Sequence, residues 1–316
     1  MNKVKLIIFV FLFFTTGCLN YTELNDIGII NSIGINKKGN NYIININMLT
    51  PTEKDLQNNN VYEIESNSLN EAFDKLYLKT SKQTNLSHLE LLILSNNLTK
   101  DDYDNIKDFF INRTDSRNTF NVIMLENYTR ENVFKFTQEE INNLISTNNS
   151  EDGLVSPKSF DEMLEDILSI KISYIPLIEI HENMNILGYK SIYEKNKTLS
   201  KKESIAYNFI TNKIKRATIV DNETNIKIDK SITNIKINKD IITININSTI
   251  MSNDSNQSIT EKYNKLLKSY INDFINKYYQ DYFYKLIEKY TYNKYKAKDI
   301  KFIINIKSKY NMEVYK

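Results

Sequence analysis

DIGIINSIGINKKGNNYIININML, residues 26–49, is a stretch in which isoleucine recurs at alternate positions on both sides of a polar turn. Ile27 and Ile29 follow the two-residue period of a β-strand, and residues 42–49 alternate in the same way. Between these runs, residues 37–41, KKGNN, contain the glycine and asparagines that are typical of a tight turn. The stretch therefore predicts a β-hairpin near the beginning of the folded chain.

Strands and helices alternate in the next hundred residues. Ser68 and Glu71 form a capping-box pattern that predicts the start of a helix. The other elements expected here are strands over 89–94 and 119–125, a helix from about 101, and a helix over 129–146. Residues 148–153, NNSEDG, are polar and rich in helix breakers, so they predict a domain boundary.

Two further groups of elements are predicted beyond this boundary. In the first, Ser156 and Pro157 are expected to open a helix, which strands over 174–182 and 187–194 follow. The second has a helix over 203–211, strands over 217–220, 225–228, 232–237 and 241–250, a long helix over 259–290, and a last strand over 300–306. An aromatic stripe on the long helix is expected to cover the isoleucine-rich sheet.

These patterns predict an α+β (mixed α/β) protein of three domains, residues 18–147, 154–199 and 200–316. Each domain is expected to be a mixed or antiparallel sheet packed with helices. The composition agrees, because only 6 Gly and 3 Pro occur among 316 residues, with 21 Tyr, 15 Phe and no Trp. So few breakers exclude a linker or a low-complexity protein.

Residues 1–18, MNKVKLIIFVFLFFTTGC, end in the single cysteine of the chain. Lys3 and Lys5 precede an apolar run over 6–14, which is much shorter than the roughly 20 residues of a membrane-spanning helix. Residues 1–17 are therefore predicted to be a removable signal peptide, and Cys18 to be the lipidation site of a lipoprotein. The alternatives are an ordinary secretory signal with a chance cysteine, and a buried free thiol. No intramolecular disulfide can form.

Charge is unevenly distributed along the chain. The formal net charge is +2, but residues 257–316 carry thirteen Lys against six Asp or Glu. This asymmetry predicts a basic C-terminal face that could meet an anionic bilayer or an acidic partner. The alternative is an ordinary solvated helix face.

Reactive groups are sparse in the sequence. His88 and His181 are isolated, and neither has a second His or Cys at metal-ligand spacing. No Walker loop, dinucleotide fingerprint or G-x-S-x-G elbow is present, although a Ser or Asp nucleophile remains open. His88 is expected to be a structural hydrogen-bonding residue. We therefore predict a non-enzyme with no cofactor, no metal site and no nucleic-acid partner.

Short segments of the chain match a known family. They are Cys18, Glu23, Leu24, Asp26, Gly28, Gly34 and Ile35; residues 87–90, SHLE; residues 108–117, DFFINRTDSR; and Gly188, Tyr193, Glu203 and Ser204. As a set they resemble the Ger(x)C spore germination proteins, the lipoprotein C subunits of nutrient germinant receptors. Typical members have Trp where this chain has Leu19 and Asp where it has Asn36, and they have a longer third domain.

The resemblance implies three α/β domains, attachment to the outer face of the inner spore membrane, and association with the A-type and B-type membrane-embedded subunits. In this family context Arg113 and Arg117 are either interface residues or core salt-bridge residues, and structural pairing is the default expectation. The expected function is that of a lipid-anchored, non-catalytic receptor subunit for assembly or signalling in nutrient-triggered germination. Two alternatives remain open: a lipid-anchored extracytoplasmic solute-binding protein, with a polar cleft between domains, and an anchored hydrolase, with a clustered nucleophile and base.

Overall fold

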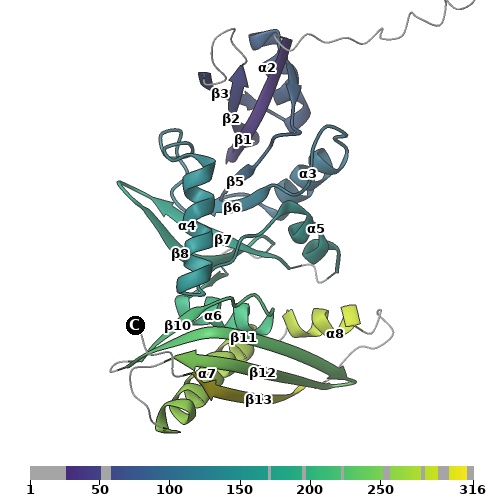
Figure 1. The fold of residues 1–316 in the computed structure, drawn as a ribbon. Helices are drawn as coiled ribbons and strands as arrows, with labels where there is room; N and C mark the ends of the chain where they lie inside the picture. Colours follow the sequence, from purple (N-terminus) through teal and green to yellow (C-terminus); the bar gives the residue numbers. More distant parts are fainter. Residues whose placement is uncertain are drawn as a thin grey trace, which may run out of the picture.

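The structure is a computed structural model that describes residues 26–50, 58–169, 172–193, 197–221, 224–251, 257–278, 282–290 and 299–311. The predicted signal peptide and Cys18 lie outside these residues. Two sheets, here named sheet A and sheet B, follow each other along an elongated molecule, and helices pack on both (Figure 1). The predicted mixed α/β class is confirmed.

Sheet A has the strand order β3-β2-β1-β5-β6-β7-β8-β9, and β4 also pairs with β1. The strands are β1 (Ile27–Lys38), β2 (Asn41–Thr50), β3 (Asn58–Ser66), β4 (Gln83–Asn85), β5 (Leu91–Ser95), β6 (Asn121–Leu125), β7 (Tyr174–Ile180), β8 (Met184–Ser191) and β9 (Thr198–Leu199). The predicted hairpin is confirmed as β1 and β2, which are antiparallel and turn at Gly39 with a φ of +62°. The central strands β1, β5, β6 and β7 are parallel.

Helices cover both faces of sheet A. One face carries α2 (Leu69–Thr80), α3 (Lys100–Ile111) and α5 (Phe160–Ser169), which share one hydrophobic core. The other carries α4 (Gln138–Glu151) and α6 (Lys201–Ile210), which share a second core. The residues of β5 divide between these cores by alternation, because neighbouring side chains of a strand point to opposite faces. This explains why β5 is apolar at almost every position.

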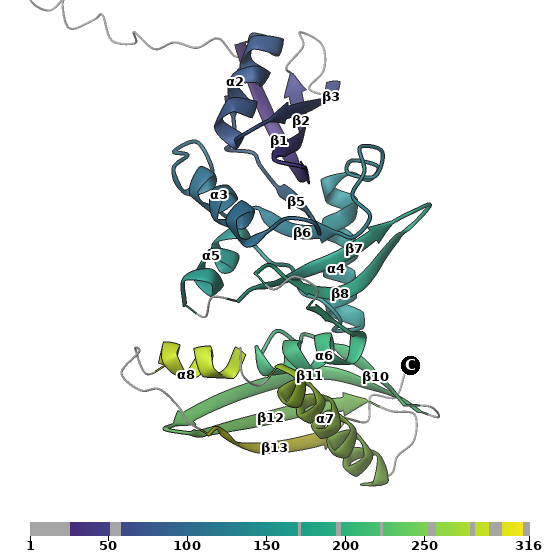
Figure 2. The ribbon, with the colours of Figure 1, turned by 180° about the vertical axis from the view of Figure 1, so that it is seen from behind.

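Sheet B consists of β10 (Ala217–Asp221), β11 (Thr224–Asn238), β12 (Ile241–Met251) and β13 (Lys301–Tyr310), in that order. Helix α7 (Gln257–Tyr278) crosses one face of this sheet, as Figure 2 shows. Helix α8 (Tyr284–Tyr290) follows it. Strands β10, β11 and β12 are antiparallel, whereas β13 runs parallel to β12.

The aromatic stripe of α7 lies in the core. Tyr263 and Phe274 are fully buried, and the ring of Phe274 lies 6.2 Å from that of Tyr207 in α6. The core of sheet B is continuous with the core beneath α4 and α6. The prediction that the stripe covers the sheet is therefore confirmed.

The prediction of one long helix over 259–290 is wrong in one respect. The structure has two helices there, α7 and α8. Tyr282 and Phe283 lie between them, and both are buried. Figure 1 shows α8 beside β11 and not in line with α7. In this position Ile287 is fully buried in the same core.

Two other helix starts differ from the prediction. Helix α4 begins at Gln138 and not at 129, because Thr137 and Glu140 form a capping box there. Helix α5 begins at Phe160 and not at Pro157. The residues before it instead follow β6, since the amide of Val122 donates to the carbonyl of Lys158 over 2.8 Å.

The predicted boundary at residues 148–153 does not separate two sheets. Helix α4 extends to Glu151, and β7 pairs directly with β6. Gly153 has a φ of +65°, and a Cβ at this position would lie 2.6 Å from the Cβ of Ala217. The segment is thus a tightly packed helix end. The three-domain division stays a prediction, but its first two parts share sheet A.

Candidate functional site

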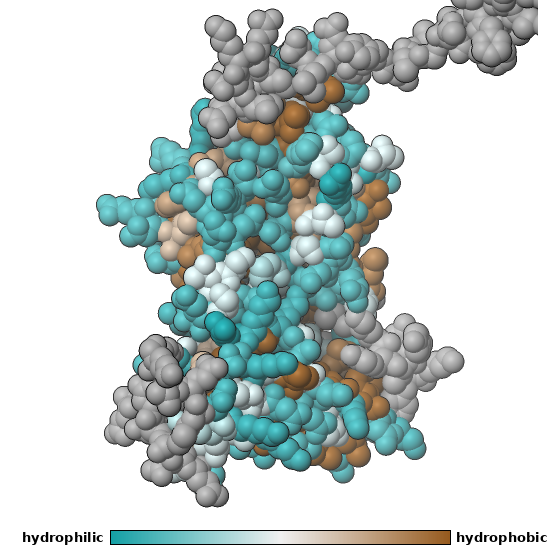
Figure 3. All heavy atoms as spheres, in the orientation of Figure 1, coloured by the Kyte–Doolittle hydropathy of each residue, from teal (hydrophilic) through white to brown (hydrophobic). Residues whose placement is uncertain are grey.

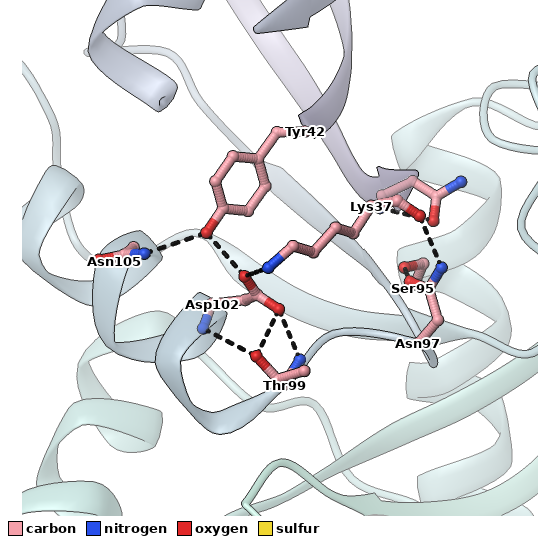
Figure 4. Close-up of polar contacts among 8 residues, drawn as sticks. Lys37, Tyr42, Ser95, Asn97, Thr99, Asp102 and Asn105 are labelled. Carbon is pink, nitrogen blue, oxygen red and sulfur yellow. Dashed lines mark hydrogen bonds and ion pairs between the residues drawn. The ribbon is translucent and has the colours of Figure 1, made fainter. Parts of the chain in front are cut away.

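A cluster of polar side chains lies where β1 and β2 meet the beginning of α3 (Figure 4). Its centre is Asp102, whose side chain is 1% exposed. Lys37, from the end of β1, forms an ion pair with one carboxylate oxygen of Asp102. Tyr42, from β2, donates its hydroxyl to that oxygen over 2.8 Å.

The second carboxylate oxygen of Asp102 caps the helix. It accepts a hydrogen bond from the amide of Thr99 over 2.7 Å and another from the Thr99 hydroxyl over 2.6 Å. Burial raises the cost of the charge, but the contacts with Lys37 and Thr99 outweigh it and hold the pKa of Asp102 below its usual value. Asp102 is therefore ionised at neutral pH, and both of its carboxylate oxygens have hydrogen-bond or ion-pair partners within the chain.

Tyr42 is held between two partners. It donates to Asp102, and its oxygen accepts a hydrogen bond from the side-chain amide of Asn105 over 3.1 Å. Burial raises the pKa of Tyr42 to about 12, so the phenol stays protonated. The side-chain amide of Asn97 also donates to the carbonyl of Lys37 over 2.9 Å. The cluster thus joins the hairpin to α3 through a charged and fully bonded centre.

A cavity of about 310 Å³ opens beside the cluster. Its lining residues are Tyr42, Asn67, Ser68, Leu69, Asn70, Asn105, Asp108, Phe109, Asn112 and Arg113. Arg113 forms a bidentate ion pair with Asp115, at 2.7 Å for each bond, and its guanidinium lies 5.1 Å from the centre of the Phe73 ring. The expected structural pairing of Arg113 is therefore confirmed. Arg117 is exposed.

A second cavity, of about 300 Å³, lies between α5, α6, β11 and α8. Two ion pairs line it: Lys158 with Asp166 at 2.5 Å, and Lys213 with Glu162 at 2.9 Å. Burial lowers the pKa of Lys158, although Asp166 opposes the shift. Because these charges are paired within the chain, the lining favours a structural role over ligand capture.

The two histidines lie apart. His88 is exposed in the turn before β5, and its expected role as a structural hydrogen-bonding residue stays a prediction. His181 is also exposed, and its Nε2 lies 3.2 Å from Glu179. Within the described ranges, no three His, Cys, Asp or Glu side chains lie close enough to hold a metal ion.

The cluster around Asp102 is not predicted by any sequence pattern described above. Lys37 and Asp102 are 65 residues apart, and no local pattern reports such a contact. One signal was present, because Thr99 and Asp102 have the spacing of a capping box. The predicted lipidation site, Cys18, lies outside the described residues. Among the residues that the structure describes, no helix is both long and apolar enough to span a bilayer.

The chain matches the family model described as "Spore germination protein N-terminal domain" over residues 20–180. It is 28% identical to spore germination protein KC of Bacillus subtilis (strain 168) over 131 residues, which cover 38% of this chain and 32% of that protein. The aligned part thus spans about a third of the curated relative. The crystal structure of the GerBC protein aligns with a TM-score of 0.48 and 16% identity, over 87% of this chain and 96% of that chain.

The family match covers half of the chain, and it includes the hairpin, the Asp102 cluster and all of sheet A up to the end of β7. This chain therefore belongs to the family defined by the spore germination protein N-terminal domain.

Proposed function

We propose that this protein is a lipid-anchored, non-catalytic subunit of a spore germinant receptor. In this proposal Cys18 carries the lipid that attaches the chain to the outer face of the inner spore membrane. The protein acts with two membrane-embedded subunits, of the A and B types, in receptor assembly or signalling during nutrient-triggered germination.

The observation that carries the proposal is the family match, which begins at residue 20, two residues after the only cysteine. A short apolar run over residues 6–14, followed by three small residues before that cysteine, suits a lipoprotein signal. The Asp102 cluster supports a structural role, since its carboxylate and phenol are bonded to other groups of the chain and are not poised for proton transfer.

The lipid anchor is tested with Cys18→Ala in the full chain, produced in a spore-forming host. We expect the variant to leave the membrane fraction, because no acyl chain can be attached, while its circular dichroism and thermal unfolding stay unchanged. Leu19→Ala is the matched control and should remain in the membrane fraction. Mass spectrometry that finds an unmodified Cys18 in membrane-isolated wild-type protein would overturn the anchor.

Receptor membership is tested by mild detergent extraction and affinity purification of the wild-type chain. We expect two multi-span membrane proteins to co-purify in fixed proportion. The solute-binding alternative predicts a different result, namely tight and stoichiometric binding of a nutrient such as an amino acid to the isolated chain in calorimetry.

A further inference from the structure

Sheet B has one covered face and one open face. Helix α7 crosses the covered face in Figure 2, and Figure 1 shows the strands from the opposite side. The burial of side chains alternates along β12 in agreement with this. Ile242, Ile244 and Ile246 are fully buried, and the residues between them are accessible to solvent. We call the opposite side the open face of sheet B.

The open face is basic and carries no carboxylate on its alternating positions. Strand register places these side chains together on it: Lys230, Ile232, Asn234, Lys236 and Asn238 from β11; Ile241, Thr243, Asn245, Asn247 and Thr249 from β12; and Lys301, Ile303, Asn305, Lys307 and Lys309 from β13. All five lysines are exposed. Asp229, at the bulge in β11, lies 3.6 Å from Arg216, which offsets its charge.

The basic surface continues around the edge of the sheet. A groove of about 740 Å³ lies between β13 and α7, and Lys265, Lys268 and Lys307 line it together with asparagine amides. No Asp or Glu is among its lining residues. Lysines from a helix and from a strand thus line one shallow groove with hydrogen-bonding side chains beside the open face.

The chemistry of this surface fits lipid headgroups better than a protein partner. Protein interfaces favour aromatic residues and arginine and are depleted in lysine, whereas the open face has lysines and no aromatic residue or arginine. Its exposed apolar side chains are few, namely Ile232 at 50%, Ile303 at 46% and Ile241 at 38%, and Figure 3 shows this end of the molecule as mostly hydrophilic with scattered hydrophobic residues. Spread lysines with a few exposed apolar side chains suit the phosphates and the shallow apolar layer of an anionic bilayer.

We propose that the open face of sheet B and its adjoining groove bind the phosphate headgroups of an anionic lipid bilayer. Strand β1 begins at the far end of the molecule from sheet B (Figures 1 and 2). Where the proposed anchor at Cys18 also holds, the chain has a membrane contact at each end and lies alongside the bilayer. The lipid contact itself does not depend on the anchor.

The test uses residues 18–316 with Cys18→Ser, which keeps every contact described above and carries no lipid. The protein is sedimented with vesicles of phosphatidylcholine alone or with about a third of phosphatidylglycerol. We expect binding to the anionic vesicles only, and binding that weakens as salt is added. The triple variant Lys236→Glu, Lys307→Glu, Lys309→Glu should bind them at least about tenfold more weakly.

The control variant Lys38→Glu, Lys79→Glu, Lys100→Glu makes the same change in net charge at exposed lysines around sheet A. It should keep most of the binding, and urea unfolding checks that both variants fold. Equal losses in the two variants would overturn the proposal, because net charge alone would then explain binding. Binding to polyglutamate without binding to anionic vesicles would overturn it in favour of an acidic protein partner. Neither result bears on Cys18 lipidation.

Discussion

Asp102 shows how one side chain can serve two parts of the fold. Its carboxylate caps α3 through Thr99 and at the same time neutralises Lys37 at the end of β1. An ion pair as buried as this adds little net stability, because both charges lose water. Removing one partner is costly, however, since it leaves the other without compensation. The cluster therefore fixes where α3 sits against the hairpin.

We predict that Asp102→Asn lowers the free energy of unfolding by about 1–3 kcal/mol, because the amide cannot accept from Thr99, Tyr42 and Lys37 together. Urea unfolding of the chain measures this change. Asp101→Asn is the control, since Asp101 is the exposed neighbour on the same helix, and it should cost no more than about 0.5 kcal/mol. Equal effects of the two substitutions would contradict the role of the cluster.

The same residue predicts a pH dependence. The pKa of Asp102 in the folded chain lies below its usual value of 3.8, so the unfolded chain binds this proton first as the pH falls. The stability from Asp102 is thus fully present above the usual pKa and is lost as the pH falls through the folded pKa. We expect the cost of Asp102→Asn to shrink between about pH 5 and about pH 3 in urea unfolding. If the cost of Asp102→Asn did not change with pH, the charge of Asp102 would not be the source of this stability.

At the scale of elements, β8 depends on a glycine. Gly188 has a φ of +133°, and a Cβ there would lie 2.6 Å from the carbonyl oxygen of Leu199 and 2.7 Å from Oγ of Ser204. We predict that Gly188→Ala costs more than about 1 kcal/mol, through both backbone strain and this clash. Gly39→Asn is the control, because its turn is open and asparagine tolerates a positive φ, so the change should stay within about 0.5 kcal/mol. Thermal unfolding of the two variants measures both changes in stability.

The aromatic face of helix α7 holds the helix against the core that it shares with sheet B. Phe274→Ala should cost about 3–5 kcal/mol, because a fully buried ring is lost and a cavity remains. Asp273→Ala, on the exposed side of the same turn, is the control and should change stability little. An unmoved melting temperature with lost subunit association would show that the stripe is a partner surface.

The lysines of α7 differ in their contacts with the rest of the chain. Lys265 is exposed, but Lys277 forms an ion pair of 2.8 Å with Glu203, which is 8% exposed. Glu203 also caps α6 by accepting from the amide of Ser200. Reversing Lys277 would therefore disturb the contact between α6 and α7, whereas reversing Lys265 changes only the surface charge.

At the scale of the whole molecule, the sequence predicted those features that depend on residues close together along the chain. The hairpin around Gly39 and the start of α2 at Ser68 depend on neighbouring residues, and both are confirmed. Strand β3 was missed, because NNNVYEIES begins with asparagines that hide its alternation. The pairing of β6 with β7, and of Lys37 with Asp102, joins distant residues, so single-sequence periodicity could not reveal either.

The shared sheet A predicts how fragments behave. Residues 18–147 should fail to fold cooperatively, because β6 loses its partner β7. The rings of Phe110 and Phe120 also lose Phe160, whose ring centre lies 5.2 and 4.9 Å from theirs. Residues 18–193 keep these contacts and are the matched control. Proton–nitrogen NMR spectra should be poorly dispersed for the shorter fragment and better dispersed for the longer one. A well-dispersed spectrum of the shorter fragment would support the predicted boundary at 148–153.

Strand β13 gives the molecule an order of folding. It pairs in parallel with β12, and such a pair can form only after the intervening crossover, which contains α7 and α8, has been made and folded back. Sheet A, by contrast, is complete at Leu199. A ribosome that synthesises the chain from its N-terminus therefore releases the whole of sheet A first, while sheet B must wait until β13 has been made. The β12–β13 pair joins residues 60 positions apart, such as Ile241 and Lys301, so we expect its formation to be among the slow steps of refolding.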